Sequence, residues 1–124
     1  MRRFFCFIIF LLLTFSMRAQ VLKAIDSLQN ELINISSENQ KKTDLLNQIG
    51  YNYWVVDSQK SIDYGERALK LSQELSYDAG VAMARRVLGV AYWTLEKSKL
   101  ALENLTESQK NMLKSMMTKV LLIV

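Results

Sequence analysis

The sequence predicts an all-α fold built from antiparallel helix hairpins, and three observations support this prediction. The chain of 124 residues has no proline and four glycines, so few residues interrupt helices. After residue 20, apolar residues recur at steps of three and four, and no segment alternates with a period of two. The pattern aliphatic–Gly–x–x–Tyr–Trp occurs twice, around Gly50 and around Gly89, which predicts a repeated unit.

Residues 1–19 have the layout of a secretory signal peptide. Arg2 and Arg3 precede a run of apolar residues, 4–15, and a short polar stretch follows. About twelve helical residues rise about 18 Å, whereas the hydrocarbon core of a bilayer is about 30 Å thick. We therefore expect export, periplasmic or secreted, with cleavage after Ala19, although Met17 is larger than is usual two positions before the cut. The alternatives are an uncleaved membrane anchor and a buried N-terminal helix.

Charge and cysteine content argue against two classes of function. Of the 16 Lys and Arg residues, three lie within the first twenty positions, so the remaining 13 nearly balance the 12 Asp and Glu. No basic stripe is left to neutralise phosphates, which argues against nucleic-acid binding. The single cysteine, Cys6, lies in the signal segment, so the exported chain has no disulfide and no thiol chemistry.

Five helices are expected after the signal segment, joined by loops of about two to four residues that make neighbouring helices antiparallel. Their apolar positions lie on one face over residues 21–35, 40–56, 61–75, 79–95 and 97–114. These helices group into a leading half-repeat, two repeats and an apolar tail from a truncated repeat, over residues 20–37, 38–76, 77–115 and 116–124. The N-cap candidates are residues 36–39, Asp57 or Ser58, and Asp78.

The repeated glycine has a physical explanation. A glycine inside a helix costs about 1 kcal/mol relative to alanine, so its use twice at the same place indicates a close approach of a second helix. A tyrosine one turn later, Tyr53 or Tyr92, can fill the space beside that contact. Small residues in the following helix suit a close crossing, and they are Ser61, Gly65 and Ala68 in the first repeat and Ala101 and Ser108 in the second.

This pattern resembles the tetratricopeptide repeat family, which has Leu-Gly, two residues and Tyr in the first helix and spaced alanines in the second. The second copy matches through Leu88, Gly89, Tyr92, Ala101 and Leu105, with Ser108 at the last small position. The first copy matches through Ile49, Gly50, Tyr53 and Ala68, with Ser61 in place of an alanine and Gly65 at the aromatic position. The spacing of 39 residues exceeds the usual 34 or so. The resemblance implies a short α-solenoid, and a plain helical bundle is the alternative.

The residues that enzymes use are scarce in this chain. There is no histidine, which removes His-based general bases and most zinc sites. The four glycines form no phosphate-binding loop. The carboxylate pairs at helical spacing lie on faces rich in Lys and Arg, where solvated side chains are expected, and they are Asp63/Glu66 and Glu103/Glu107. We predict a non-enzyme without a cofactor or metal.

In tetratricopeptide repeats, the first helix of each pair lines a concave groove that holds a peptide. By this resemblance the candidate groove residues are Asn47, Tyr51, Trp54, Arg86, Val90 and Trp93. Tyr, Trp and Arg are the residue types enriched at interface hot spots. The alternative is that Trp54 and Trp93 pack in the core, where aromatic side chains contribute most.

The expected function is an exported module that binds a protein or peptide. In the family, such exported repeats often begin longer proteins, so the chain is interpreted as a fragment of the sensory region of a signalling protein. Membrane contact is expected only through the signal segment or a missing downstream span. The alternative is a structural or assembly protein that self-associates through its solenoid ends, because the apolar tail lacks the polar outer face of a capping helix.

Overall fold

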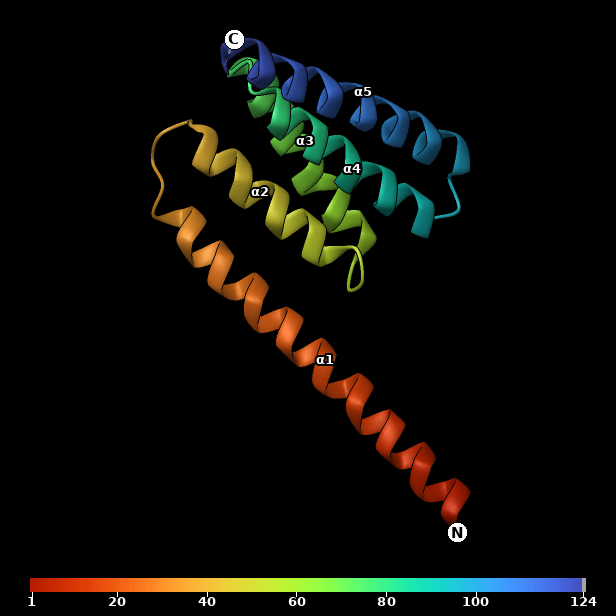
Figure 1. The fold of residues 1–124 in the computed structure, drawn as a ribbon. Coiled ribbons are helices and arrows are strands. Elements are labelled where there is room, and N and C mark those ends of the chain that lie inside the picture. Colours follow the sequence, from red (N-terminus) through yellow and green to blue (C-terminus); the bar gives the residue numbers. More distant parts are fainter. Residues whose placement is uncertain (124) are drawn as a thin grey trace.

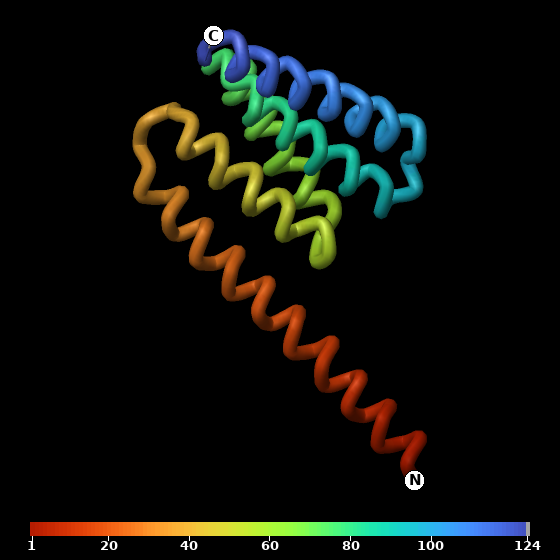
Figure 2. Tube along the Cα trace, viewed as in Figure 1, coloured from red at the N-terminus to blue at the C-terminus, as the bar shows by residue number. Residues whose placement is uncertain are grey.

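The structure, a computed structural model, describes residues 1–123 and contains five helices and no strand within them. The helices are α1 (Arg2–Ile33), α2 (Gln40–Tyr53), α3 (Ser58–Glu74), α4 (Asp78–Thr94) and α5 (Ser98–Ile123) (Figure 1). Each helix contacts the next along the chain, and α2 also contacts α4. Figure 2 shows α2 to α5 gathered into one body, from which the first half of α1 projects. The all-α class predicted from the sequence is confirmed.

Helix α1 runs unbroken across the predicted cleavage site at Ala19. Every residue from 1 to 20 is exposed, and Ile25 is the residue through which α1 enters the core. Among the described residues, α1 is the one helix long and apolar enough to cross a membrane, with a mean hydropathy of 2.0 over 18 residues. A buried N-terminal helix is therefore wrong, whereas a signal peptide and a membrane anchor are both compatible with this helix.

Side-chain caps explain where α2 and α3 begin. Asn39 Oδ1 accepts a hydrogen bond from the backbone N–H of Lys42 at 2.9 Å, and Asp57 Oδ1 accepts from Gln59 and Lys60 at 3.1 Å each. Because Asp57 is the cap, α3 starts at Ser58, three residues earlier than the apolar pattern predicts.

The predicted cap at Asp78 is wrong. The N-cap of α4 is Tyr77, which makes no side-chain cap bond, and Asp78 is the first helical residue. Its Oδ1 lies 3.4 Å from Lys114 Nζ, so this carboxylate links the start of α4 to α5. A carboxylate in the first turn is still favourable for the helix dipole.

Helices α3 and α4 end in the same way. Ser76 and Glu96 follow the last turns with φ of 52° and 59°, in the left-handed region. The next N–H reaches back five residues, from Tyr77 to Ser72 O at 2.8 Å and from Lys97 to Tyr92 O at 2.9 Å. These bonds complete Schellman motifs, which reverse the chain within a short loop.

The remaining helix ends differ from the sequence prediction. Helix α2 ends at Tyr53 rather than at residue 56, because the N–H of Val56 and of Asp57 both turn back to Tyr53 O, at 2.9 and 2.7 Å. Helix α5 continues through Ile123, so residues 116–123 are part of a helix rather than a separate tail. The side chains of 120–123 are 60–86% exposed, and Val124 lies outside the described residues.

The core lies between α2, α3 and α4 and extends to α1. Its buried apolar clusters are Leu46, Ala68, Leu71 and Ala84; Ile25, Ile49 and Tyr53; and Ile62, Leu88 and Ala91. Tyr53 stacks on Tyr64 with ring centroids 5.6 Å apart. Gln29 Nε2 of α1 donates to both tyrosine hydroxyls, at 3.2 and 2.9 Å, so the leading helix is tied to α2 and α3.

Gly50 and Gly89 lie at close helix approaches, as the sequence analysis predicts. A Cβ on Gly50 would lie 3.0 Å from Val87 Cγ1, and one on Gly89 would lie 2.6 Å from Leu105 Cγ. Small residues of the following helix bond to backbone carbonyls across these crossings. Ser61 Oγ donates to Gly50 O at 2.7 Å, and Ser108 Oγ donates to Ala82 O at 2.7 Å. At Gly50, glycine thus allows the contact and serine bridges it, whereas Ser108 links α5 to α4 about two turns away from Gly89.

Candidate interaction surface

Two tryptophans at equivalent places in the repeat line one surface cavity. Trp54 follows directly after α2, and Trp93 is the last residue but one of α4. The cavity measures about 550 Å³, and its other lining residues are Thr94, Glu96 and Ser98. Trp93 is 68% exposed and Trp54 is half-buried. Packing in the core is therefore wrong as an interpretation of Trp93.

A hydrogen bond between two hydroxyl groups links the segments that carry the tryptophans. Ser58 Oγ, in the first turn of α3, lies 2.6 Å from Thr94 Oγ1, and these two oxygens share a hydrogen bond. Thr94 Oγ1 also bonds to Ala91 O at 2.7 Å. The α2–α3 and α4–α5 loops thus lie side by side, although 36 residues separate Ser58 from Thr94 in the sequence.

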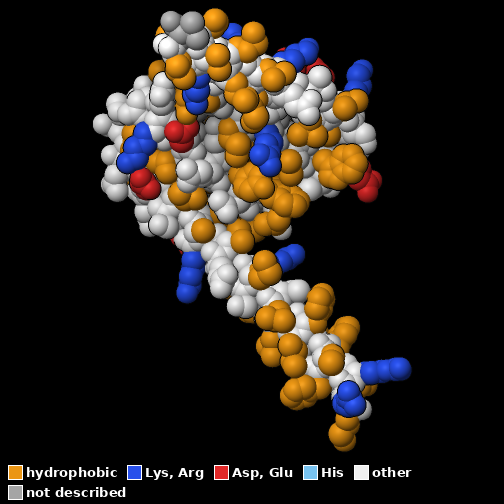
Figure 3. Space-filling view, in the orientation of Figure 1, with side chains coloured by type: hydrophobic (Ala, Val, Ile, Leu, Met, Phe, Trp, Pro, Cys, Tyr) orange, Lys and Arg blue, Asp and Glu red, His pale blue; other side chains and the backbone are white. Residues whose placement is uncertain are grey.

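Tyr51 and Arg86 extend this surface along α2 and α4. Both side chains are exposed, and the Arg86 guanidinium lies 5.9 Å from the centroid of the Tyr51 ring. Val90, between Arg86 and Trp93 on α4, is half-buried. Figure 3 shows the body with hydrophobic side chains gathered over the visible face and Lys and Arg side chains among them.

Asn47 does not belong to the exposed surface. It is 2% exposed, and its Nδ2 donates to Gly80 O of α4 at 3.2 Å. Asn47 is a structural contact between α2 and α4, which corrects its prediction as a groove residue. Asn47 lies on the same face of α2 as Thr43 and Gly50, because steps of four and three residues separate the three positions. All three are buried, so the helical spacing relative to Gly50 was the signal that Asn47 faces the core.

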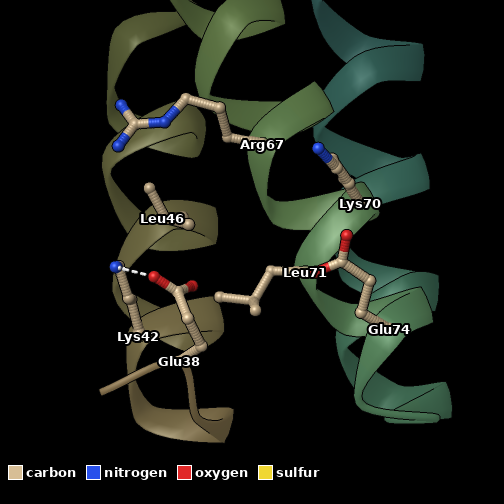
Figure 4. Close-up of a pocket in the computed structure, with 7 residues that line it drawn as sticks. All are labelled: Glu38, Lys42, Leu46, Arg67, Lys70, Leu71 and Glu74. Atoms are coloured by element: carbon tan, nitrogen blue, oxygen red, sulfur yellow. Dashed lines mark hydrogen bonds and ion pairs between the residues drawn. The ribbon is translucent and has the colours of Figure 1, made fainter. Parts of the chain in front are cut away.

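A second hollow of about 320 Å³ lies between α2 and α3 (Figure 4). Leu46 and Leu71 form its apolar floor, and charges of both signs surround it. Lys42 pairs with Glu38 across one turn, while the Arg67 guanidinium covers the ring of Tyr64 at 5.0 Å. The rim of the hollow therefore mixes charges of both signs, and three of its charged residues already have partners within the chain.

Among the titratable groups of residues 1–123, three have shifted pKa values, and each shift has a local cause. Burial, together with the hydrogen bond to Asp44 at 3.0 Å, raises the pKa of Tyr77. Burial and the charge of Glu66 raise the pKa of Tyr92. The hydrogen bond from Lys110 lowers the pKa of Glu107. Within residues 1–123, no group of three His, Cys, Asp or Glu side chains is arranged to hold a metal ion.

No family model, curated protein or solved structure matches this chain. Function is therefore inferred from the surface itself.

Proposed function

We propose that the chain is an exported module that binds a protein or peptide on the surface formed by α2 and α4. In this proposal the hairpins α2–α3 and α4–α5 stack as a short solenoid of the tetratricopeptide type. The pattern of contacts between helices supports this arrangement. Helix α2 contacts α4, while α3 makes no contact with α5 within the described residues. Stacked hairpins whose first helices line the inner side have this order of contacts.

The observation that carries the proposal is the exposure of large aromatic side chains on α2 and α4. Tyr51 is 38% exposed, Trp93 is 68% exposed, and the Arg86 guanidinium lies over the Tyr51 ring. Exposed Tyr, Trp and Arg on one surface have the composition of a hot spot that becomes buried when a partner binds. We propose a binding role without catalysis, cofactor or metal, as the sensory part of a larger signalling protein.

Site-specific photo-crosslinking tests the proposal. A photoreactive amino acid in place of Tyr51 should form adducts with a partner in the native compartment. The matched control is Asp63, an exposed residue of α3, where the same substitution should form none. Equal adducts from both positions would contradict the proposed surface. Adducts of twice the chain mass would identify a second copy of this chain as the partner on this surface.

The proposed export has its own measurement. Mass spectrometry of the native protein should find an N-terminus at Gln20, because the apolar run ahead of Ala19 is exposed and packs on nothing in the body. An intact Met1 in a membrane fraction would show that this segment is a membrane anchor rather than a cleaved signal peptide. An intact Met1 in the soluble cytoplasm would refute export.

Self-association through α5 is the second candidate, and one comparison within the chain favours it. Ile62 of α3 is 5% exposed because it packs with Leu88 and Ala91 of α4. Leu102 follows the small residue Ala101 on α5 as Ile62 follows Ser61 on α3, yet Leu102 is 69% exposed. Sedimentation at several concentrations should then show a dimer that Leu102→Lys dissociates. The first proposal instead expects a monomer in both forms.

A further inference from the structure

Four of the five tyrosines are covered by a cation from the chain itself. The distances from the cation to the ring centroid are 5.9 Å for Arg86 over Tyr51 and 5.4 Å for Lys60 over Tyr53. They are 5.0 Å for Arg67 over Tyr64 and 5.9 Å for Lys97 over Tyr92. The fifth, Tyr77, donates its hydroxyl to Asp44 instead. Within residues 1–123, no such cation lies over Trp54 or Trp93, although indole is the ring that attracts cations most strongly.

The cavity between the tryptophans has the chemistry of a cation site. The residues that line it are two tryptophans, the hydroxyl-bearing Thr94 and Ser98 and the acidic Glu96, and none of them is a Lys or Arg. Lys97, the neighbour of Glu96, lies over the ring of Tyr92. The Schellman turn at the end of α4 sets the backbone position of Glu96. One negative charge therefore lies beside two uncovered aromatic rings.

We propose that this cavity binds the side chain of an arginine or lysine from a partner polypeptide. A volume of about 550 Å³ lies within the range of ligand clefts. Guanidinium groups stack on aromatic rings and bond to carboxylates at the same time, so Trp54, Trp93 and Glu96 match an arginine best. The inference rests on the proposed function, because it names the partner's chemistry at one end of the same surface.

A lipid surface is the competing partner for these tryptophans. Val55, Val56 and Leu95 in the same two loops are 45, 38 and 38% exposed, and tryptophan is common at bilayer interfaces. The carboxylate decides between the two partners. Glu96 repels anionic headgroups, whereas it attracts a basic side chain, so the cavity favours the peptide.

Intrinsic fluorescence reports on this cavity directly, because the chain has two tryptophans and both line it. The full chain, in neutral detergent micelles at constant ionic strength, is titrated with the capped tripeptide Gly-Arg-Gly. The control peptide replaces arginine with citrulline, which keeps the shape and removes the charge. The arginine peptide should give a saturable change in emission, with an affinity about tenfold higher than that of the citrulline peptide.

The variant Glu96→Gln should weaken binding of the arginine peptide about fivefold. Glu103→Gln removes the same charge from an exposed site on α5 and should leave binding unchanged. Equal affinity for the two peptides, an unchanged Glu96→Gln variant, or a response only to anionic phosphatidylglycerol vesicles would overturn the inference. If Tyr51 adducts form while the wild-type chain does not bind the arginine peptide, this inference fails and the proposed function stands. Loss of the Tyr51 adducts in the wild type would remove the proposed function itself.

Discussion

Replacing Gly89 with alanine tests the close crossing of α4 and α5. The new Cβ would lie 2.6 Å from Leu105 Cγ, 2.7 Å from Leu105 Cδ2 and 3.3 Å from Ala101 O. Alanine favours a helix interior over glycine by about 1 kcal/mol, whereas overpacking costs about 1–3 kcal/mol. Because Leu105 must move and the Ala101 carbonyl is fixed in α5, overpacking should win. We expect Gly89→Ala to lower the free energy of unfolding by about 1 kcal/mol, and Gly89→Leu to lower it by about 3 kcal/mol.

The decisive measurement repeats the substitution in a Leu105→Ala background. There the obstructing side chain is gone, so Gly89→Ala should keep only its helix preference and stabilise by up to about 1 kcal/mol. The sign of the effect therefore reverses between the two backgrounds. Thermal unfolding followed by circular dichroism resolves this, since 1 kcal/mol shifts the midpoint by about 4–8 °C in a domain of this size.

A control variant separates this contact from general effects on α5. Gln109 is exposed on the same helix, so Gln109→Ala should change the stability by less than about 0.5 kcal/mol. If Gly89→Ala raises the midpoint in both backgrounds, the steric explanation for the glycine is wrong.

Three further predictions concern the turn after α3, the alkaline limit of stability and the end of α5. Ser76→Gly should stabilise the fold by about 0.5–1 kcal/mol, because Ser76 has a φ of 52° that glycine adopts without strain. The control Ser27→Gly, at an exposed helical position, should instead destabilise the fold, and chemical denaturation measures the sign of both effects. The raised pKa of Tyr77, caused by burial and then Asp44, means that its stabilisation is complete below about pH 10 and lost as the pH rises through the folded-state pKa. Urea midpoints above pH 10 should then fall more steeply in the wild type than in Tyr77→Phe, and parallel curves would refute this. Leu121 and Leu122 are 73 and 83% exposed, so replacing both with Glu should reduce light scattering of the exported form without changing its helicity. Unchanged scattering would show that this end of α5 does not drive self-association.

Local chemistry in the sequence determined the helical class, the repeat and most helix starts. The apolar steps of three and four depend on helix geometry alone, so they predict helices before any packing is known. Asp57 caps α3 because a short carboxylate before a helix reaches the free N–H groups of the first turn. The paired Gly50 and Gly89 predicted close crossings because the helix penalty of glycine needs a compensating contact.

Only the tertiary structure decided which side chains are covered. Asn47 and Arg86 are 39 residues apart, at the same place in the two copies, yet Asn47 is buried against α4 and Arg86 is exposed. Ile62 and Leu102 differ in the same way. Asn47 of α2 and Ile62 of α3 both pack on α4, whereas the described residues hold no helix in the equivalent position for Arg86 of α4 or Leu102 of α5. Burial depends on the neighbours that the fold brings to a face, and a repeated motif is the same whether or not a neighbour is there.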